Sequence, residues 1–174
     1  MKRDISLWQW IGFGVTATGG TLLHFLYEWT GESLIAAFIS GVNESTWEHM
    51  KLLFFPAFLF ALIQSRFFKE QQSFWCIKLA GLLTGLILIP VLFYTYNGVI
   101  GKSPDWVNIS IFFISASVAF IFENRLFKKE RGECRYNKIA FILICVIGVL
   151  FVLFTFYPPH IPLFKDPVSG QYGI

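Results

Sequence analysis

The chain has 174 residues, of which 14% are charged, whereas about 25% of the residues in a typical soluble domain are charged. Apolar residues make up 55% of the chain and come in long blocks, which excludes a soluble globular core. The net charge is +3. The basic residues gather at the ends of the apolar blocks, where membrane topology explains them, and this excludes a nucleic-acid partner. We therefore expect one membrane domain, residues 1–174, in contact with the lipid bilayer.

The predicted fold is an all-α, polytopic membrane helix bundle with about five transmembrane helices. A bilayer core of about 30 Å needs roughly 20 predominantly apolar residues per helix. In the first span, Gly12, Thr16 and Gly20 recur every four residues, a spacing that lets another helix approach closely. The predicted spans are residues 7–29, 45–68, 74–96, 105–124 and 139–157.

Two further segments lie outside the predicted spans. Residues 33–40 are apolar but too short to cross a bilayer, so we expect a short interfacial or re-entrant half-helix. Residues 158–174 contain four prolines, which predict an extended extracellular tail without helix.

The distribution of basic residues predicts the orientation. Eleven of the 14 lysines and arginines fall in the amino-terminal leader and around the second and fourth connections, and three fall on the other side. Because cytoplasmic segments are enriched in these residues, we expect a plasma-membrane protein with a cytoplasmic amino terminus and an extracellular carboxyl terminus.

The basic side of the predicted bundle also holds cysteines and one notable carboxylate. Cys76 and Cys134 fall on this side, and with Cys145 they lack the spacing of metal ligands, so we expect all three to be reduced and unpaired. Glu123 lies beside Arg125 at the end of the fourth span, where we expect a solvated pair at the membrane interface.

The segment from Asn43 to His49 places two carboxylates and a histidine directly before an apolar run. One interpretation is structural. Asn43 could cap the second helix, or Ser45 and Glu48 could form a capping box. In either case, acidic residues in the first turn complement the helix dipole.

The first span carries a second group of polar residues. His24 and Glu28 are spaced i, i+4 on one helical face and lie inside the end of the span. Ionisable side chains at that depth are costly, so they indicate a functional site by default. The alternative is a buried His–Glu pair that fixes helix packing.

A metal site would use both polar segments. Imidazole and carboxylate groups suit zinc, and a catalytic zinc needs three protein ligands and an open position. Carboxylates nearby would orient a ligand or act as a general base. The candidate zinc ligands are the chain's three histidines, His24, His49 and His160. The candidate catalytic groups are Glu28, Glu44 and Glu48.

The same reasoning predicts the geometry of the site. We expect His24, Glu28, Glu44, Glu48 and His49 to converge in one outward-opening pocket between the first two spans, because an unpaired charge there is costly. The tail around His160 should lie over the pocket, and residues 33–40 should border it.

Three motifs resemble those of an uncharacterised family of small bacterial multi-pass integral membrane proteins. The first is His-x-x-x-Glu at residues 24–28, and the second is Asn-Glu-Ser-x-Trp-Glu-His at residues 43–49. The third is the tail, with Pro-Pro-x-Ile-Pro at residues 158–162. The resemblance covers most of the chain and implies no activity.

A shorter stretch is similar to part of the progestin and adiponectin receptor-type membrane proteins. It comprises Asn43-Glu44-Ser45 and Trp47-x-His49. In that superfamily the matching histidine binds zinc in an intramembrane amidase-like site, so the similarity implies a zinc-ligand role for His49 alone.

These patterns leave the biochemical role open between several classes. One hypothesis is a metal-dependent hydrolase that acts on a lipid or another amphiphile at an outward-facing His/Glu site. The alternatives are small-solute or proton-coupled transport and a non-catalytic membrane interaction subunit. The sequence does not decide whether the protein is an enzyme.

Overall fold

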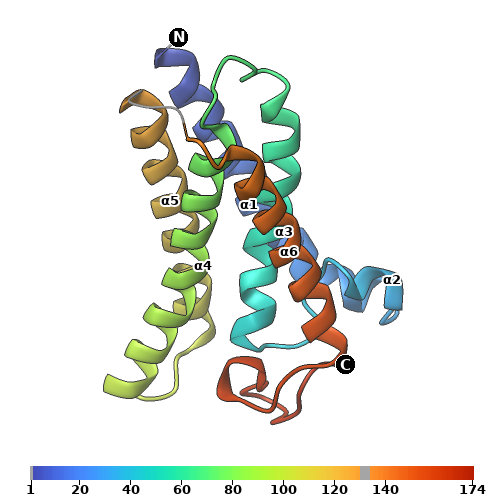
Figure 1. The fold of residues 1–174 in the computed structure, drawn as a ribbon. Helices are drawn as coiled ribbons and strands as arrows, with labels where there is room; N and C mark the ends of the chain where they lie inside the picture. Colours follow the sequence, from blue (N-terminus) through green and yellow to red (C-terminus); the bar gives the residue numbers. More distant parts are fainter. Residues whose placement is uncertain (1, 130–133) are drawn as a thin grey trace.

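The computed structural model describes residues 2–129 and 134–174, and within them the chain is an all-α helical bundle, as predicted. The α1 helix lies beside both α3 and α5, which run in the opposite direction to it (Figure 1). The elements are α1 (Lys2–Trp29), α2 (Leu34–Ala37), α3 (Thr46–Ser65), α4 (Phe74–Val99), α5 (Asp105–Lys129), α6 (Asn137–Phe156) and the 3-10 turn η1 (Pro162–Phe164).

Four of the described helices, α3, α4, α5 and α6, are long and apolar enough to cross a membrane. This indicates a membrane protein. The predicted first span lies in α1, which is not one of the four. However, α1 lies beside α3 along its whole length, because the Trp8 and Phe67 ring centroids are 4.8 Å apart and those of His24 and His49 are 5.7 Å apart. The α1 helix therefore extends over the same thickness as α3.

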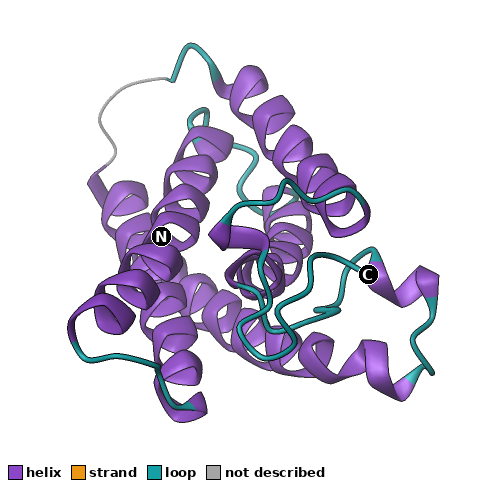
Figure 2. Ribbon diagram, turned by 90° about the horizontal axis from the view of Figure 1, so that it is seen from below, coloured by secondary structure: helices purple, strands orange, loops and turns teal. Residues whose placement is uncertain are grey.

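The amino and carboxyl termini lie at opposite ends of the bundle, while α2 projects from its side (Figure 1). We call these ends the N end and the C end. Seen from the C end, the tail after α6 crosses in front of the helix ends (Figure 2). The tail thus covers part of the surface at which α3 begins.

A glycine in α1 explains why α1 and α3 approach so closely. Pro56 has no N–H, so the carbonyl of Leu52 loses its partner within α3. Gly20 lies against that carbonyl, and a Cβ at this position would be 2.9 Å from the Leu52 oxygen and 2.5 Å from the Phe112 ring. The small-residue spacing in α1 therefore marks a helix contact, as the sequence predicts.

The structure contradicts two expectations for the N end. Cys76 and Cys134 form a disulfide, so the prediction that they are reduced and unpaired is wrong. Glu123 is buried and pairs with Lys78 at 2.6 Å, so it is not a solvated partner of Arg125. Both contacts join residues more than 40 positions apart, which local sequence patterns do not reveal.

Replacing Gly20 by Ala should destabilise the protein by about 1–3 kcal/mol, because the new methyl group would meet a backbone carbonyl that cannot move aside. The control is Gly14→Ala in the same helix, where an added Cβ meets nothing within 4 Å. That change should leave stability unchanged or raise it by up to about 1 kcal/mol through helix propensity. Thermal unfolding in detergent would measure both, and equal effects would contradict the packing described here.

Reporters fused after Lys129 and after Ile174 should lie on opposite sides of the membrane, because α5 ends at the N end and the tail lies at the C end. The side that each reporter detects would also show whether the N end is cytoplasmic, a point on which the basic residues and the disulfide disagree. Basic residues favour a cytoplasmic N end, whereas disulfides persist in oxidising compartments. Two reporters on the same side would contradict the arrangement of the helices.

Candidate functional site

The start of α3 is fixed by a network of side-chain contacts with the backbone. Ser45 is the N-cap, and its hydroxyl accepts a hydrogen bond from the Glu48 N–H at 3.3 Å. The Asn43 side-chain oxygen accepts from the Ser45 N–H at 2.9 Å. Only one half of the predicted capping box forms. In a complete box the Glu48 carboxylate would accept from the Ser45 N–H, but this N–H donates to Asn43 instead.

The carboxylate of Glu48 instead forms a buried ion pair with Lys51, at 2.5 Å. Both side chains are almost completely buried. Thr155 of α6 donates a hydrogen bond to Glu48 at 2.8 Å and accepts one from Lys51 at 2.8 Å. Lys51 also donates to the carbonyl of Ala37 in α2 at 3.0 Å. The pair therefore connects α2, α3 and α6. Both charged groups also have hydrogen-bond partners from the protein.

The short helix α2 packs over this ion pair rather than over the histidines. Ala36 and Ala37 are buried in a small cluster with Tyr27, while Leu34 and Ile35 are exposed. The expectation that residues 33–40 border the histidine site is therefore wrong. The hydrogen bond from Lys51 to the Ala37 carbonyl holds α2 at the ion pair, because it satisfies one of the three N–H donors of the ammonium group.

A second polar cluster joins α1 to the start of α3. The Glu44 carboxylate lies 3.6 Å from Nε2 of His24 and 3.5 Å from Nε2 of His49. Nδ1 of His49 is 2.9 Å from the Ser45 carbonyl oxygen, which can only accept, so Nδ1 is the donor. In the neutral ring Nε2 is then an acceptor that faces Glu44. All three groups remain partly exposed.

Two cavities meet at these histidines. One, of about 400 Å³, is polar, and Glu44, Lys102 and Asp105 line it together with Pro167 and Val168 of the tail. The other, of about 260 Å³, is a mainly apolar groove between α1 and α5. Four residues line both cavities: His24, His49, Asn108 and Ile109.

The predicted five-residue pocket is correct for His24, Glu44 and His49 and wrong for the other two residues. Glu48 is sealed in its ion pair, and Glu28 is exposed and lines neither cavity. The i, i+4 spacing of His24 and Glu28 gives them a common helical face. The buried Tyr27 shows that the packed face of α1 at this level is a different one.

His160 lines neither of the two cavities at the other two histidines. It is exposed, and its ring packs on Tyr172 with centroids 4.7 Å apart. Across residues 2–129 and 134–174, no group of three or more His, Cys, Asp or Glu side chains is placed to hold a metal ion. The geometry therefore gives no support to the three-histidine zinc site, and the zinc cofactor stays a prediction.

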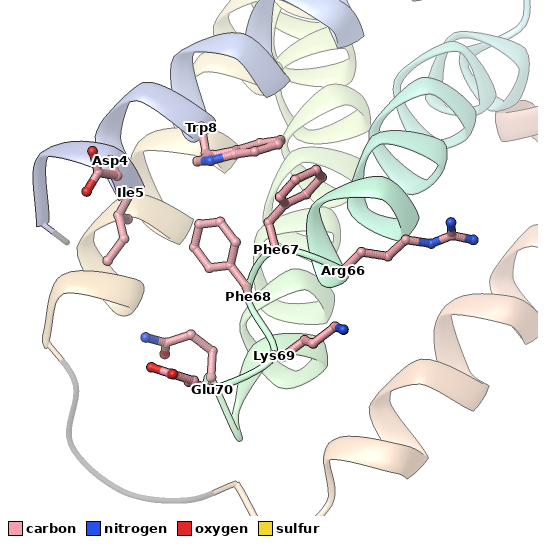
Figure 3. A pocket seen from close by; sticks show the side chains of 9 residues that line it. Asp4, Ile5, Trp8, Arg66, Phe67, Phe68, Lys69 and Glu70 are labelled. Carbon is pink, nitrogen blue, oxygen red and sulfur yellow. The ribbon is translucent and has the colours of Figure 1, made fainter.

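Another cavity, of about 420 Å³, lies at the N end, where Trp8, Phe67 and Phe68 face one another (Figure 3). Arg66 and Lys69 extend away from Asp4 and Ile5 on its opposite wall (Figure 3). The described residues that line this cavity include no histidine, so it lacks the imidazole groups of the site at the C end.

A family model described as a family of unknown function, DUF6512, matches residues 1–174. The chain belongs to this family. No curated protein and no solved structure matches the chain. The family carries no activity over to the chain, so the role of the site has to be argued from its geometry.

Replacing Glu48 by Gln should destabilise the protein by about 3–5 kcal/mol, because the buried Lys51 ammonium would lose its counter-ion. The double variant Glu48→Gln/Lys51→Met should recover part of this loss. The exposed Glu28→Gln serves as the control and should change stability by less than about 0.5 kcal/mol. Unfolding curves in detergent would measure all three, and a Glu48→Gln variant as stable as the control would contradict a structural role for the pair.

Proposed function

We propose that this membrane protein binds an amphiphile, with the polar head at His24, Glu44 and His49 and the apolar part in the groove between α1 and α5. The observation that carries this proposal is that the two histidines line both a polar cavity and an apolar groove. A molecule that occupies both spaces must itself be polar at one end and apolar at the other.

The surroundings of the groove support the same proposal. Phe25 of α1 and Ile109 and Phe113 of α5 line it and remain exposed, as expected for side chains that contact lipid. These exposed side chains support a groove that faces the bilayer, which an alkyl chain would enter sideways without crossing water. Pockets that are mainly apolar with a few convergent polar groups are typical ligand sites.

Hydrolysis of the bound amphiphile is a second candidate function, favoured by the orientation of His49. Since its Nδ1 donates to the Ser45 carbonyl, its Nε2 can accept a proton from water. The water oxygen would then bond to an ester carbonyl carbon, the carbon–oxygen bond to the alcohol would break, and the histidine would return the proton to that alcohol. Glu44 would stabilise the imidazolium that forms in between.

The binding proposal can be tested with a diazirine-labelled monoacylglycerol and the full-length protein in lipid nanodiscs. Cross-linked peptides should come from residues 20–25 and 108–113, which form the groove walls. Thr21→Trp should abolish cross-linking because the indole would fill the groove. Leu22→Trp is the matched control, since Leu22 is exposed on the same helix but does not line the groove.

His24→Ala and His49→Ala should weaken cross-linking, whereas Glu28→Gln should not, because Glu28 lies outside both cavities. Cross-linking that is unaffected by Thr21→Trp would contradict the proposal. In the same samples, release of fatty acid that is lost with His49→Ala would add hydrolysis to binding. Measurement of bound metal would test the zinc prediction separately.

A further inference from the structure

A second buried ion pair lies toward the N end, in a different setting from the first. Lys78 of α4 and Glu123 of α5 are 2.6 Å apart, and both are at least 97% buried. Lys78 is surrounded by the aromatic rings of Phe60, Phe120 and Phe127, with centroids 5.4 to 5.9 Å from Nζ. The pair therefore lies in the apolar interior of the bundle.

Two glutamines lie at the same level as this pair. A Cβ added at Gly12 would touch both Phe60 and Phe120, which places these three residues in one layer of α1, α3 and α5. One helical turn from this layer toward the N end leads to Gln9 in α1, Gln64 in α3 and Glu123 in α5. With Lys78, the bundle thus has one polar layer of four residues, each from a different helix.

Neither glutamine has its hydrogen-bonding capacity satisfied by the protein. Gln9 is 3% exposed and Gln64 is 0% exposed. Within the described residues, no side-chain nitrogen or oxygen of either amide has a hydrogen-bond partner. Buried amides without partners are unfavourable and rare in folded proteins. This layer therefore has buried amide donors and acceptors that no described protein group satisfies.

The Glu48–Lys51 pair provides an internal comparison. There Thr155, the Ala37 carbonyl and the Val42 N–H complete the hydrogen bonds of both charged groups. Around Lys78 the structure places aromatic rings, and the two unpaired amides belong to the same layer. Among the described residues, protein groups complete the hydrogen bonds of the first pair, whereas the rings packed on Lys78 cannot replace the polar partners that a buried ion pair requires.

A groove lies beside Gln9. It has a volume of about 150 Å³, lies between α1 and α5, and is lined by Gln9, Ser117 and Asn124. The other lining residues are Trp10, Phe13, Phe120 and Ile121, so the groove is mainly apolar and meets the polar layer at Gln9. The groove is large enough for several water molecules, each of which occupies about 30 Å³ in the liquid.

We propose that Gln9, Gln64, Lys78 and Glu123 form a binding site for internal water molecules. The water satisfies the two amides and solvates the ion pair. Water is the ligand that fits, because one molecule can both donate to and accept from amide, ammonium and carboxylate groups. The site is independent of the histidine cluster at the C end.

Hydroxyl-radical footprinting by X-ray radiolysis tests this proposal, because radicals formed from bound water modify the side chains next to it. The full-length protein in lipid nanodiscs is irradiated for milliseconds, and modified peptides are measured by mass spectrometry. Phe127 contacts the Lys78 ammonium and is 0% exposed. Phe54 is the matched control, also 0% exposed and surrounded by apolar residues. We expect modification of Phe127 and none of Phe54.

The double variant Gln9→Leu/Gln64→Leu removes the amides while approximately keeping their volume. It should reduce modification of Phe127 to the background of Phe54. If Phe127 in the unaltered protein is as unreactive as Phe54, the layer is dry and the proposal fails, whether or not the variant folds. Modification of Phe127 that persists in the folded double variant would also overturn the role of the glutamines. Cross-linking of an amphiphile at Thr21 is unaffected by either result.

Discussion

The ion pair between Glu48 and Lys51 determines how the C end of this protein is built. Two charges can be buried in a membrane bundle only if each finds an opposite charge and enough hydrogen-bond partners. Here the partners come from α2, α3 and α6, so the pair requires all three segments to meet at one point. The start of α3 is thereby fixed, and with it the position of His49, one residue after Glu48. The histidine cluster thus depends on a neighbouring pair that takes no part in it.

The sequence allowed part of this arrangement to be predicted because the relevant signals are local. Long apolar blocks indicated the helical bundle, and the small residues of α1 indicated a close helix contact. His24 and His49 were expected to meet because a short connection joins the end of α1 to α3. Glu44 belongs to the same connection, and the structure places it between the two rings.

The errors have a common physical cause. The side chain of Glu28 shares a helical face with His24, but spacing along one helix does not show which neighbour that face contacts. The pairs Lys78–Glu123 and Cys76–Cys134 depend on how α4 packs beside α5 and α6. Such contacts are determined by three-dimensional packing, and each residue considered alone had an adequate local explanation. Glu48 has two local explanations, as a cap and as a catalytic group. Its partners in the structure are Lys51, Val42 and Thr155, which are three, six and 107 residues away.

The groove between α1 and α5 has a consequence for how a ligand would find the protein. With the proposed opening toward lipid, the relevant concentration of an amphiphile is its concentration within the membrane. Each buried CH₂ group contributes about 0.8 kcal/mol to partitioning into the bilayer, so a long-chain molecule is already strongly enriched there. Diffusion in the plane of the membrane would then deliver the alkyl chain to Phe25 and Phe113. Modest contacts at the two histidines would suffice to select among head groups that all arrive with the same tail.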